Sequence, residues 1–294
     1  METTITEAAI KDQCRQLRLP SVGARCMSVE QEAIRNHASH SSYLSSLLEQ
    51  ELEDRSQRRA QRRIAEARFP QIKTLADFQF AQAPIIPAAQ IGSLADGGYI
   101  DRGENVLFVG DGGTGKTMLA TALGVAACRQ GRAVRFTTVA ALVNELLEAR
   151  DQHALSRVVA RWARVELMIA DELGYVRLPP SGAELLFQVL ADRSERASVI
   201  VTTNLPFSEW TTVFPDPRLC KAVVERLTYR STIIETGTDS YRFKQSLARS
   251  QPRETEQTTH STQTRATVAP SAARNEGPAT ADTTSHVHKG EPED

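Results

Sequence analysis

The sequence predicts an α/β fold in which a parallel sheet of five strands is wound with helices. An all-helical region is expected before the sheet and a disordered tail after it. Between residues 100 and 249, short apolar runs typical of buried strands alternate with helical patterns. A glycine-rich loop separates the first apolar run from the first of these helices. The composition changes on both sides, with no strand-like run before residue 70 and few large apolar residues after residue 250.

Residues 1–70 are expected to form a small helical domain that binds DNA or a partner protein, and residues 71–100 a linker. Apolar residues recur at helical spacing in this domain, and Pro70 ends its longest helix: Tyr43, Leu44, Leu47, Leu48, Leu52, Ala60 and Ile64. The same helix is rich in arginine: Arg55, Arg58, Arg59, Arg62, Arg63 and Arg68. These arginines form either a solvated helix face, partly paired with nearby acids, or a stripe that follows nucleic-acid phosphates.

Residues 101–249 are expected to form the main domain, which contains the sheet. The predicted strands are 105–109, 133–138, 166–170, 198–203 and 232–235. The predicted helices are 117–130, 139–149, 154–164, 183–195 and 218–229. Ser181 and Glu184 have the spacing of a capping box, which predicts the start of the fourth of these helices.

The composition favours a cytoplasmic protein without membrane contact. Residues 250–294 have too few apolar side chains to offset the entropy of ordering, so they are expected to be a disordered tail. The net charge of the 294-residue chain is −1, so any DNA contact has to come from local patches. Four cysteines are scattered without a C-x-x-C pair, which is typical of reduced thiols: Cys14, Cys26, Cys128 and Cys220. No apolar run approaches the length of a membrane span, and the N-terminus has no signal-peptide pattern.

The glycine-rich loop fits the pattern G-x-x-x-x-G-K-[ST] of a phosphate-binding P-loop. It consists of Gly110, Asp111, Gly112, Gly113, Thr114, Gly115, Lys116 and Thr117, with Met118 next in the helix that follows. Glycines let backbone N–H groups turn toward a polyphosphate, and the helix N-terminus adds partial positive charge. Lys116 is expected to contact the β- and γ-phosphates, and the Thr117 hydroxyl to bind Mg²⁺. A glycine-rich turn that opens an ordinary helix is the alternative.

Two acids end the apolar run 167–170. Asp171 is expected to bind Mg²⁺, as the aspartate at the end of this strand does in P-loop ATPases. Glu172 is expected to be the general base that polarises the attacking water. The alternative is that both acids cap the next helix.

Asn204 follows a further apolar run, 199–203. Its amide can donate one hydrogen bond to the γ-phosphate or the attacking water and accept another, as a sensor residue does. Plain turn chemistry before Leu205 and Pro206 is the alternative. A P-loop, an Asp-Glu pair and a polar strand end, in this order, indicate an additional-strand ATPase. The chain has no N-K-x-D run for reading guanine, so ATP is favoured over GTP.

A ring-forming ATPase also needs a cation that reaches the γ-phosphate across a subunit boundary. Arg226 is the expected arginine finger, and Arg218 and Arg230 are neighbours that can replace it. A surface ion pair of Arg226 with Glu225 or Glu235 is the alternative.

These motifs together resemble the ATP-binding helper proteins of insertion sequences, the IstB type, which are AAA+ relatives of the DnaC helicase loaders. The resemblance covers about residues 15–249. Its more specific parts are Asp-Glu-Leu-Gly-Tyr at 171–175 and Ser-Tyr-Arg at 240–242. The chain departs from the family pattern at Asp111 and Gly112, where the family usually has two prolines, and at Met118 and Glu225, where it usually has histidine and aspartate.

The resemblance implies an AAA+ ATPase that uses ATP and Mg²⁺ and forms a homo-oligomer on duplex DNA. It also implies a partner transposase, which the helper recruits or stimulates. The alternative function is a replicative helicase loader that acts on single-stranded DNA. A small-molecule P-loop kinase is a weaker third reading, since no lid or acceptor-binding signature is visible.

Overall fold

The structure is a computed structural model, and it describes residues 7–238, 240 and 241. The α-helices are α1 (Glu7–Gln16), α2 (Pro20–Arg35), α3 (His40–Ala67), α4 (Ala88–Ala95), α5 (Gly98–Asp101), α6 (Lys116–Arg129), α7 (Val139–Asp151), α8 (Leu155–Ala163), α9 (Pro180–Arg193) and α10 (Pro217–Thr228). The strands are β1 (Asn105–Val109), β2 (Val134–Thr138), β3 (Leu167–Leu173), β4 (Ser198–Thr203) and β5 (Ser231–Glu235). Short 3-10 helices are η1 (Leu75–Asp77), η2 (Phe80–Gln82) and η3 (Phe207–Thr212).

The N-terminal helices are joined by a buried carboxylate. Glu51 lies in the middle of α3 and is only 2 % exposed. Its carboxylate accepts hydrogen bonds from the backbone N–H groups of Ser21, at 2.8 Å, and Val22, at 3.3 Å, in the first turn of α2. Negative charge is favourable at a helix N-terminus because unpaired N–H groups point outward there. Glu51 therefore fixes the start of α2 against α3.

The strands form one parallel sheet in the order β2-β3-β4-β1-β5. Strand β4 lies between β1, which leads into the glycine-rich loop, and β3, which contains the two acids. Because parallel strands end at the same edge of a sheet, the polar residues at the carboxyl ends of β1, β3 and β4 come together there. The predicted fold class, an α/β fold with a five-stranded parallel sheet of the additional-strand type, is confirmed.

Most predicted elements agree with the structure to within a few residues, and two differ in an informative way. Strand β3 continues through Asp171 and Glu172 to Leu173 and does not end at residue 170. Helix α9 begins at Pro180, and no side chain caps it, so the predicted capping box of Ser181 and Glu184 is wrong. Proline is already suited to the first position of a helix, because its fixed φ is helical and the missing N–H has no partner there.

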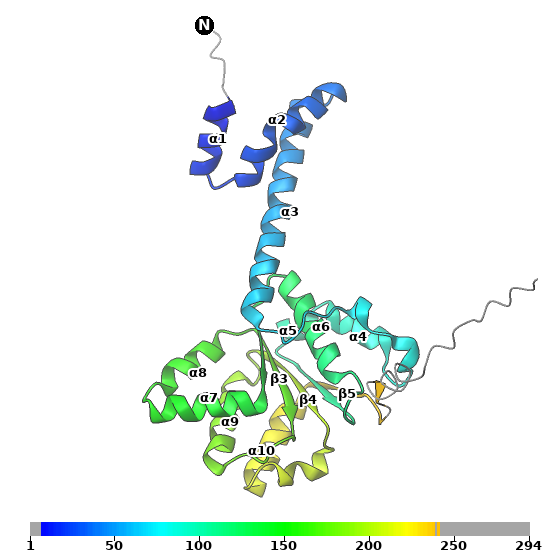
Figure 1. Cartoon of the computed structure of the whole chain (residues 1–294), viewed down its shortest axis with the longest axis vertical. Coiled ribbons are helices and arrows are strands. Elements are labelled where there is room, and N and C mark those ends of the chain that lie inside the picture. Colours follow the sequence, from blue (N-terminus) through cyan, green and yellow to red (C-terminus); the bar gives the residue numbers. More distant parts are fainter. Residues whose placement is uncertain (1–6, 239, 242–294) are drawn as a thin grey trace, which may run out of the picture. The chain divides into compact units, whose positions relative to one another are not determined.

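Helices cover both faces of the sheet (Figure 1). Helices α4, α5 and α6 pack on one face around a core that includes Phe108, Leu119 and Ile169. Helices α7, α8, α9 and α10 pack on the other face around a core that includes Leu142 and Trp210.

The segment expected to be a linker contributes to the first of these cores. Residues 71–100 contain η1, η2, α4 and the start of α5. Ile86, Ile91 and Leu94 are buried there, together with Tyr99. The domain boundaries at 70, 100 and 249 stay a prediction, and the expected disordered tail, 250–294, lies outside the described residues. No helix in the described part of the chain is both long and apolar enough to span a membrane.

Candidate active site

The glycine-rich loop connects β1 to α6 and is tightly enclosed. Gly110 has a φ of 153°, and a Cβ atom there would lie 2.4 Å from Thr236 Oγ1 and 2.7 Å from the carbonyl oxygen of Gly237. Gly115 has a φ of 99°, and a Cβ there would lie 2.6 Å from the ring of Phe78. Both positions therefore require glycine, because any side chain would collide with packed neighbours and strain the backbone.

Lys116, the first residue of α6, lies inside the loop and is 8 % exposed. Its Nζ donates hydrogen bonds to the backbone carbonyls of Gly110, at 2.7 Å, and Asp111, at 2.8 Å. The side chain of Asp111 is exposed, so its negative charge does not enter the loop. The loop thus holds a cation at its centre, as a phosphate-binding loop requires.

The hydroxyl of Thr117 and the carboxylate of Asp171 meet beside the loop. Thr117 Oγ1 donates a hydrogen bond to Asp171 Oδ1 at 2.9 Å. The hydroxyl of Thr202, on β4, donates a second hydrogen bond to the same oxygen at 2.5 Å. Asp171 is 3 % exposed and is held by both hydroxyls. A hydroxyl and a carboxylate are hard oxygen ligands, so Thr117 and Asp171 fit a Mg²⁺ ion that keeps waters or phosphate oxygens as its other ligands.

Glu172 occupies a β-bulge. Ala170 pairs with Val201 and Leu173 with Thr203, so two residues of β3 lie opposite the single residue Thr202 of β4. Glu172 has a φ of 63°, and its backbone N–H donates a hydrogen bond to Thr202 Oγ1 at 2.9 Å. Bulges turn a side chain out of the regular alternation of a strand. The exposed side chain of Glu172 lines the same cavity as Lys116.

Asn204 follows β4 at the edge of this cavity. Its Oδ1 is buried and has no hydrogen-bond partner. The turn bond at this position belongs to Thr203, whose Oγ1 accepts the backbone N–H of Leu205 at 3.1 Å. A buried acceptor without a partner in the chain is costly. The sensor role of Asn204 stays a prediction.

The cavity has a volume of about 560 Å³ and collects most of the predicted site residues. It is lined by Pro70, Gln71, Lys73, Gly112, Gly113, Gly115, Lys116, Thr117, Met118, Thr121, Glu172, Tyr175, Thr202, Thr203, Asn204 and Tyr241. Thr202 and Tyr241 were not among the predicted site residues. No local sequence pattern distinguishes Thr202 from Thr203, which precedes Asn204 directly.

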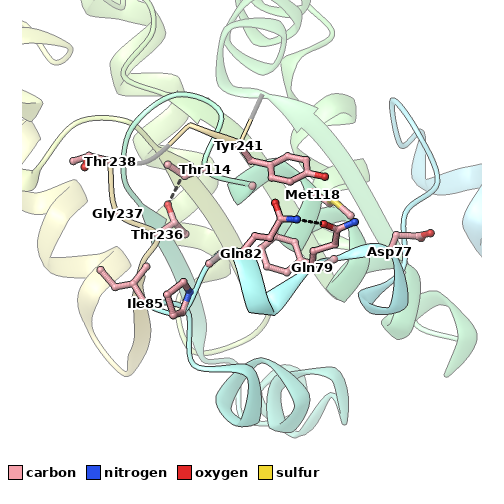
Figure 2. A pocket seen from close by; sticks show the side chains of 14 residues that line it. Asp77, Gln79, Gln82, Ile85, Thr114, Met118, Thr236, Gly237, Thr238 and Tyr241 are labelled. Atoms are coloured by element: carbon pink, nitrogen blue, oxygen red, sulfur yellow. Dashed lines mark hydrogen bonds between the residues drawn. The ribbon is translucent and has the colours of Figure 1, made fainter. Parts of the chain in front are cut away.

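An adjoining pocket of about 280 Å³ shares the wall of the loop (Figure 2). Gly115 and Met118 line both cavities, and Phe78, which packs against Gly115, lines the second one. Two side-chain amides lie at this pocket, where Gln82 Nε2 donates a hydrogen bond to Gln79 Oε1 at 2.6 Å. The sequence patterns did not point to this pocket.

Tyr241 connects the two cavities. It lines both of them, and its backbone N–H donates a hydrogen bond to the carbonyl of Gly113 at 3.1 Å. In Figure 2 its ring lies beside Met118. The chain beyond β5 therefore returns to the glycine-rich loop.

Arg226 lies on α10, and among the described residues neither it nor Arg218 or Arg230 lines the cavity of the loop. Its side chain is exposed, and its guanidinium carbon lies 5.2 Å from the ring centre of Phe187. Within the described part of the chain, Arg226 makes no ion pair with Glu225 or Glu235, the alternative weighed from the sequence. Arg230 lies 3.8 Å from a carboxylate oxygen of Glu104. The arginine-finger role of Arg226 stays a prediction.

Comparisons with known proteins identify the family of this chain. A family model described as IstB-like ATP binding protein matches residues 12–249. An insertion-sequence ATP-binding protein of Sinorhizobium fredii is 36% identical over 248 residues, which cover 84% of this chain and 83% of that protein. The ATP-binding protein of insertion sequence IS5376 from Geobacillus stearothermophilus is 35% identical and covers 80% of this chain and 94% of that protein. The crystal structure of the DnaC helicase loader is similar with a TM-score of 0.43 and 20% identity, over 50% of this chain and 87% of that chain. The resemblance predicted from the sequence is confirmed.

Proposed function

The chain belongs to the IstB-like ATP binding protein family, and we propose that it is the helper ATPase of an insertion sequence. In this role it assembles as a homo-oligomer on duplex DNA in the cytoplasm and recruits or stimulates a partner transposase. The observation that supports the proposal best is the cavity in which Lys116, the Thr117–Asp171 pair and Glu172 meet. Such a cavity serves phosphoryl transfer to water, so the enzyme class is ATPase.

When ATP binds, its phosphates replace the backbone carbonyls that Lys116 contacts within the loop. Lys116 turns from the carbonyls of Gly110 and Asp111 to the β- and γ-phosphates. Thr117 and Asp171 hold Mg²⁺, which supplies positive charge against the phosphate oxygens. The loop amides from Gly112 to Thr117 cradle the phosphates.

Hydrolysis then needs a base and an orienting group on the far side of the γ-phosphate. Glu172 accepts a proton from the attacking water while the water oxygen bonds to the γ-phosphorus. The bond between that phosphorus and the leaving oxygen of ADP breaks in the same displacement, which gives ADP and phosphate. The amide of Asn204, whose Oδ1 lacks a partner inside the chain, orients the water or the phosphate.

The base of ATP occupies the adjoining apolar pocket. Phe78, Met118 and Tyr241 offer aromatic and thioether surface to a flat ring. This pocket shares the wall of Gly115 with the phosphate cavity, so one nucleotide can fill both.

The relatives favour transposition over helicase loading, because both insertion-sequence proteins compared above are ATP-binding proteins of mobile elements. A neighbouring reading frame that encodes an integrase-type transposase, flanked by inverted repeats, is expected.

The decisive experiment measures ATP hydrolysis and DNA binding of the full chain with duplex DNA, with single-stranded DNA, and with the neighbouring transposase. Duplex DNA should be bound more tightly with ATP than without, and the transposase should join the complex. The Lys116→Ala variant should lose nucleotide binding and serves as the control. A preference for single strands together with a replicative helicase would contradict the transposition role.

A further inference from the structure

We propose that Arg135, with Arg63 and Arg161, forms a pocket for one phosphate of the duplex DNA backbone, at the junction of β2, α3 and α8. This inference rests on the proposed function, since it assigns a contact surface to the DNA that the chain is proposed to bind. The pocket is separate from the nucleotide cavity, with which it shares no lining residue.

The pocket has a volume of about 150 Å³ and receives one arginine from each of three elements. Arg63 donates from Nε to the carbonyl of Gly131 at 3.2 Å, which anchors the end of α3 beside β2. Arg135 donates from Nη1 to the backbone carbonyl of Glu66 at 3.0 Å. Arg161 enters from α8, and its side chain is 52% exposed. The fold therefore holds the three guanidinium groups in place before any ligand arrives.

Positive charge exceeds negative charge around this pocket. The side chain of Glu66 lies 3.2 Å from Arg63, and Glu145 pairs with Arg161. Arg135 has no carboxylate partner within the described part of the chain. Burial, and then the charges of Arg68 and Arg161, lower the pKa of Arg135, and Glu145 only partly opposes them.

Such an arginine is unfavourable for the isolated chain. A half-buried cation loses hydration, and here it gains one carbonyl and two like-charged neighbours in return. An anion in the pocket removes that penalty. The planar fork of a guanidinium matches the oxygens of a phosphate, so a phosphate group is the anion that this geometry fits best.

Duplex DNA supplies this group in a form that suits the surroundings. Arg62, on α3, has a side chain that is 68% exposed, and its Nε lies 3.9 Å from Glu66 Oε1. The other carboxylate oxygen of Glu66 pairs with Arg63. A backbone phosphate at Arg135 thus has further positive charge beside it, as a polyanion requires. A free phosphate ion offers the same chemistry without needing the neighbouring charge.

The test uses the full chain and the variant Arg135→Gln. Among the three arginines it is the one to change, because Arg63 anchors α3 and the loss of Arg161 would remove the ion pair of Glu145. The control is Arg150→Gln on α7, which removes the same charge from an arginine already paired with Asp151 at 3.3 Å. Binding of a fluorescent DNA duplex is measured by anisotropy over a range of KCl concentrations.

Arg135→Gln should weaken duplex binding about tenfold at low salt. It should also lower the slope of log K against log salt by about one phosphate contact, whatever the DNA sequence. Arg150→Gln should leave both quantities at the wild-type values. An unchanged slope in Arg135→Gln would overturn the proposal.

Thermal unfolding with inorganic phosphate distinguishes the two sources of the phosphate group. Without phosphate, Arg135→Gln should unfold at the same temperature as the wild type or a higher one, because a repulsive cation has been removed. Added phosphate should raise the unfolding temperature of the wild type more than that of the variant.

If phosphate has this effect but the slope of log K against log salt for duplex binding is unchanged in the variant, the pocket binds free phosphate and the DNA contact is overturned. A wild-type chain that binds no duplex DNA would contradict the proposed function instead, and an equal phosphate response in the two proteins would also overturn the pocket.

Discussion

Glu172 has a left-handed backbone conformation, with a φ of 63°. Residues other than glycine, asparagine and aspartate rarely adopt this conformation. Holding such a residue in this region costs on the order of 1 kcal/mol or more. The bulge opposite Thr202 maintains the conformation, and it directs the carboxylate to the cavity of Lys116. Strain of this kind is concentrated at functional sites, where a side chain must occupy a fixed place.

Replacing Glu172 by Gln should leave ATP binding close to the wild-type level and lower the turnover of ATP by about 10²–10⁴-fold. The amide has nearly the shape of the carboxylate but cannot accept the proton of the attacking water. Nucleotide affinity is measured by calorimetry and turnover by phosphate release.

Lys116→Ala is the matched control for this variant, because it should lose binding and turnover together. Near-normal turnover in Glu172→Gln would show that Glu172 is only a strand-end acid.

At this scale, the sequence predicted residues that stand in a short motif or directly after an apolar run, and it missed Thr202 and Tyr241. Lys116 and Thr117 belong to one loop with a fixed spacing, so their roles could be predicted. Thr202 holds Asp171 from a neighbouring strand, and no local pattern distinguishes it from Thr203. The unpartnered oxygen of Asn204 likewise depends on burial, which a sequence does not give.

Among the elements, the pair α2 and α3 depends on a single buried acid. Burial alone would raise the pKa of Glu51, but the N–H groups of Ser21 and Val22 and the side chain of Arg55 outweigh it and hold the pKa below its ordinary value of 4.5. A carboxyl group with a lowered pKa stabilises the folded chain above the unfolded pKa. That contribution is lost as the pH falls through the folded value.

Glu51→Gln should therefore lower the unfolding temperature at pH 7 and have a much smaller effect in acid, once the pH is below the folded pKa. The expected loss at pH 7 is about 1.5–3 kcal/mol, the range for hydrogen bonds to a charged group. Circular dichroism melts at a series of pH values below 7 measure this difference. Glu53→Gln, an exposed neighbour on α3, is the control, and an equal acid dependence in wild type and Glu51→Gln would contradict the role of Glu51.

The sequence predicted elements well where apolar period and boundary signals agree. Strands β1 and β4 match the predicted 105–109 and 198–203, because each is a buried run of β-branched and other apolar residues. The end of β3 was missed because acids usually stop a strand, whereas here the bulge lets pairing resume at Leu173. The role of residues 71–100 was also beyond the sequence, since a few apolar side chains in a loop-like segment do not tell which face they cover.

For the whole molecule, the position of Arg226 outside the lining of its own nucleotide cavity has a direct consequence. None of Arg218, Arg226 and Arg230 lines that cavity in the same chain. If Arg226 acts on ATP, it has to act in a neighbouring copy. Each active site would then consist of a pocket from one subunit and an arginine from the next.

Mixing two inactive variants tests this arrangement. Arg226→Ala subunits retain the pocket, and Lys116→Ala subunits retain the arginine, so a mixed assembly contains some complete sites. Each variant alone should hydrolyse ATP far more slowly than the wild type, by up to about 10³–10⁵-fold. The ATP turnover of the mixture should exceed the sum of the turnovers of the two separate variants. No recovery, in a mixture shown by cross-linking to co-assemble, would transfer the role to Arg218 or Arg230.

Lys116 donates hydrogen bonds to the carbonyls of Gly110 and Asp111, so these backbone oxygens compete with phosphate oxygens for the ammonium group. When a nucleotide binds, we expect its phosphate oxygens to replace these two backbone oxygens as the partners of Lys116. The free energy of binding then includes the difference between the new contacts of Lys116 and the ones it loses. In the structure Lys116 is enclosed by the loop and hydrogen-bonded to it, and it is not exposed to anions of the solvent. We therefore expect a nucleotide that also fills the adjoining pocket of Phe78, Met118 and Tyr241 to bind more tightly than inorganic phosphate.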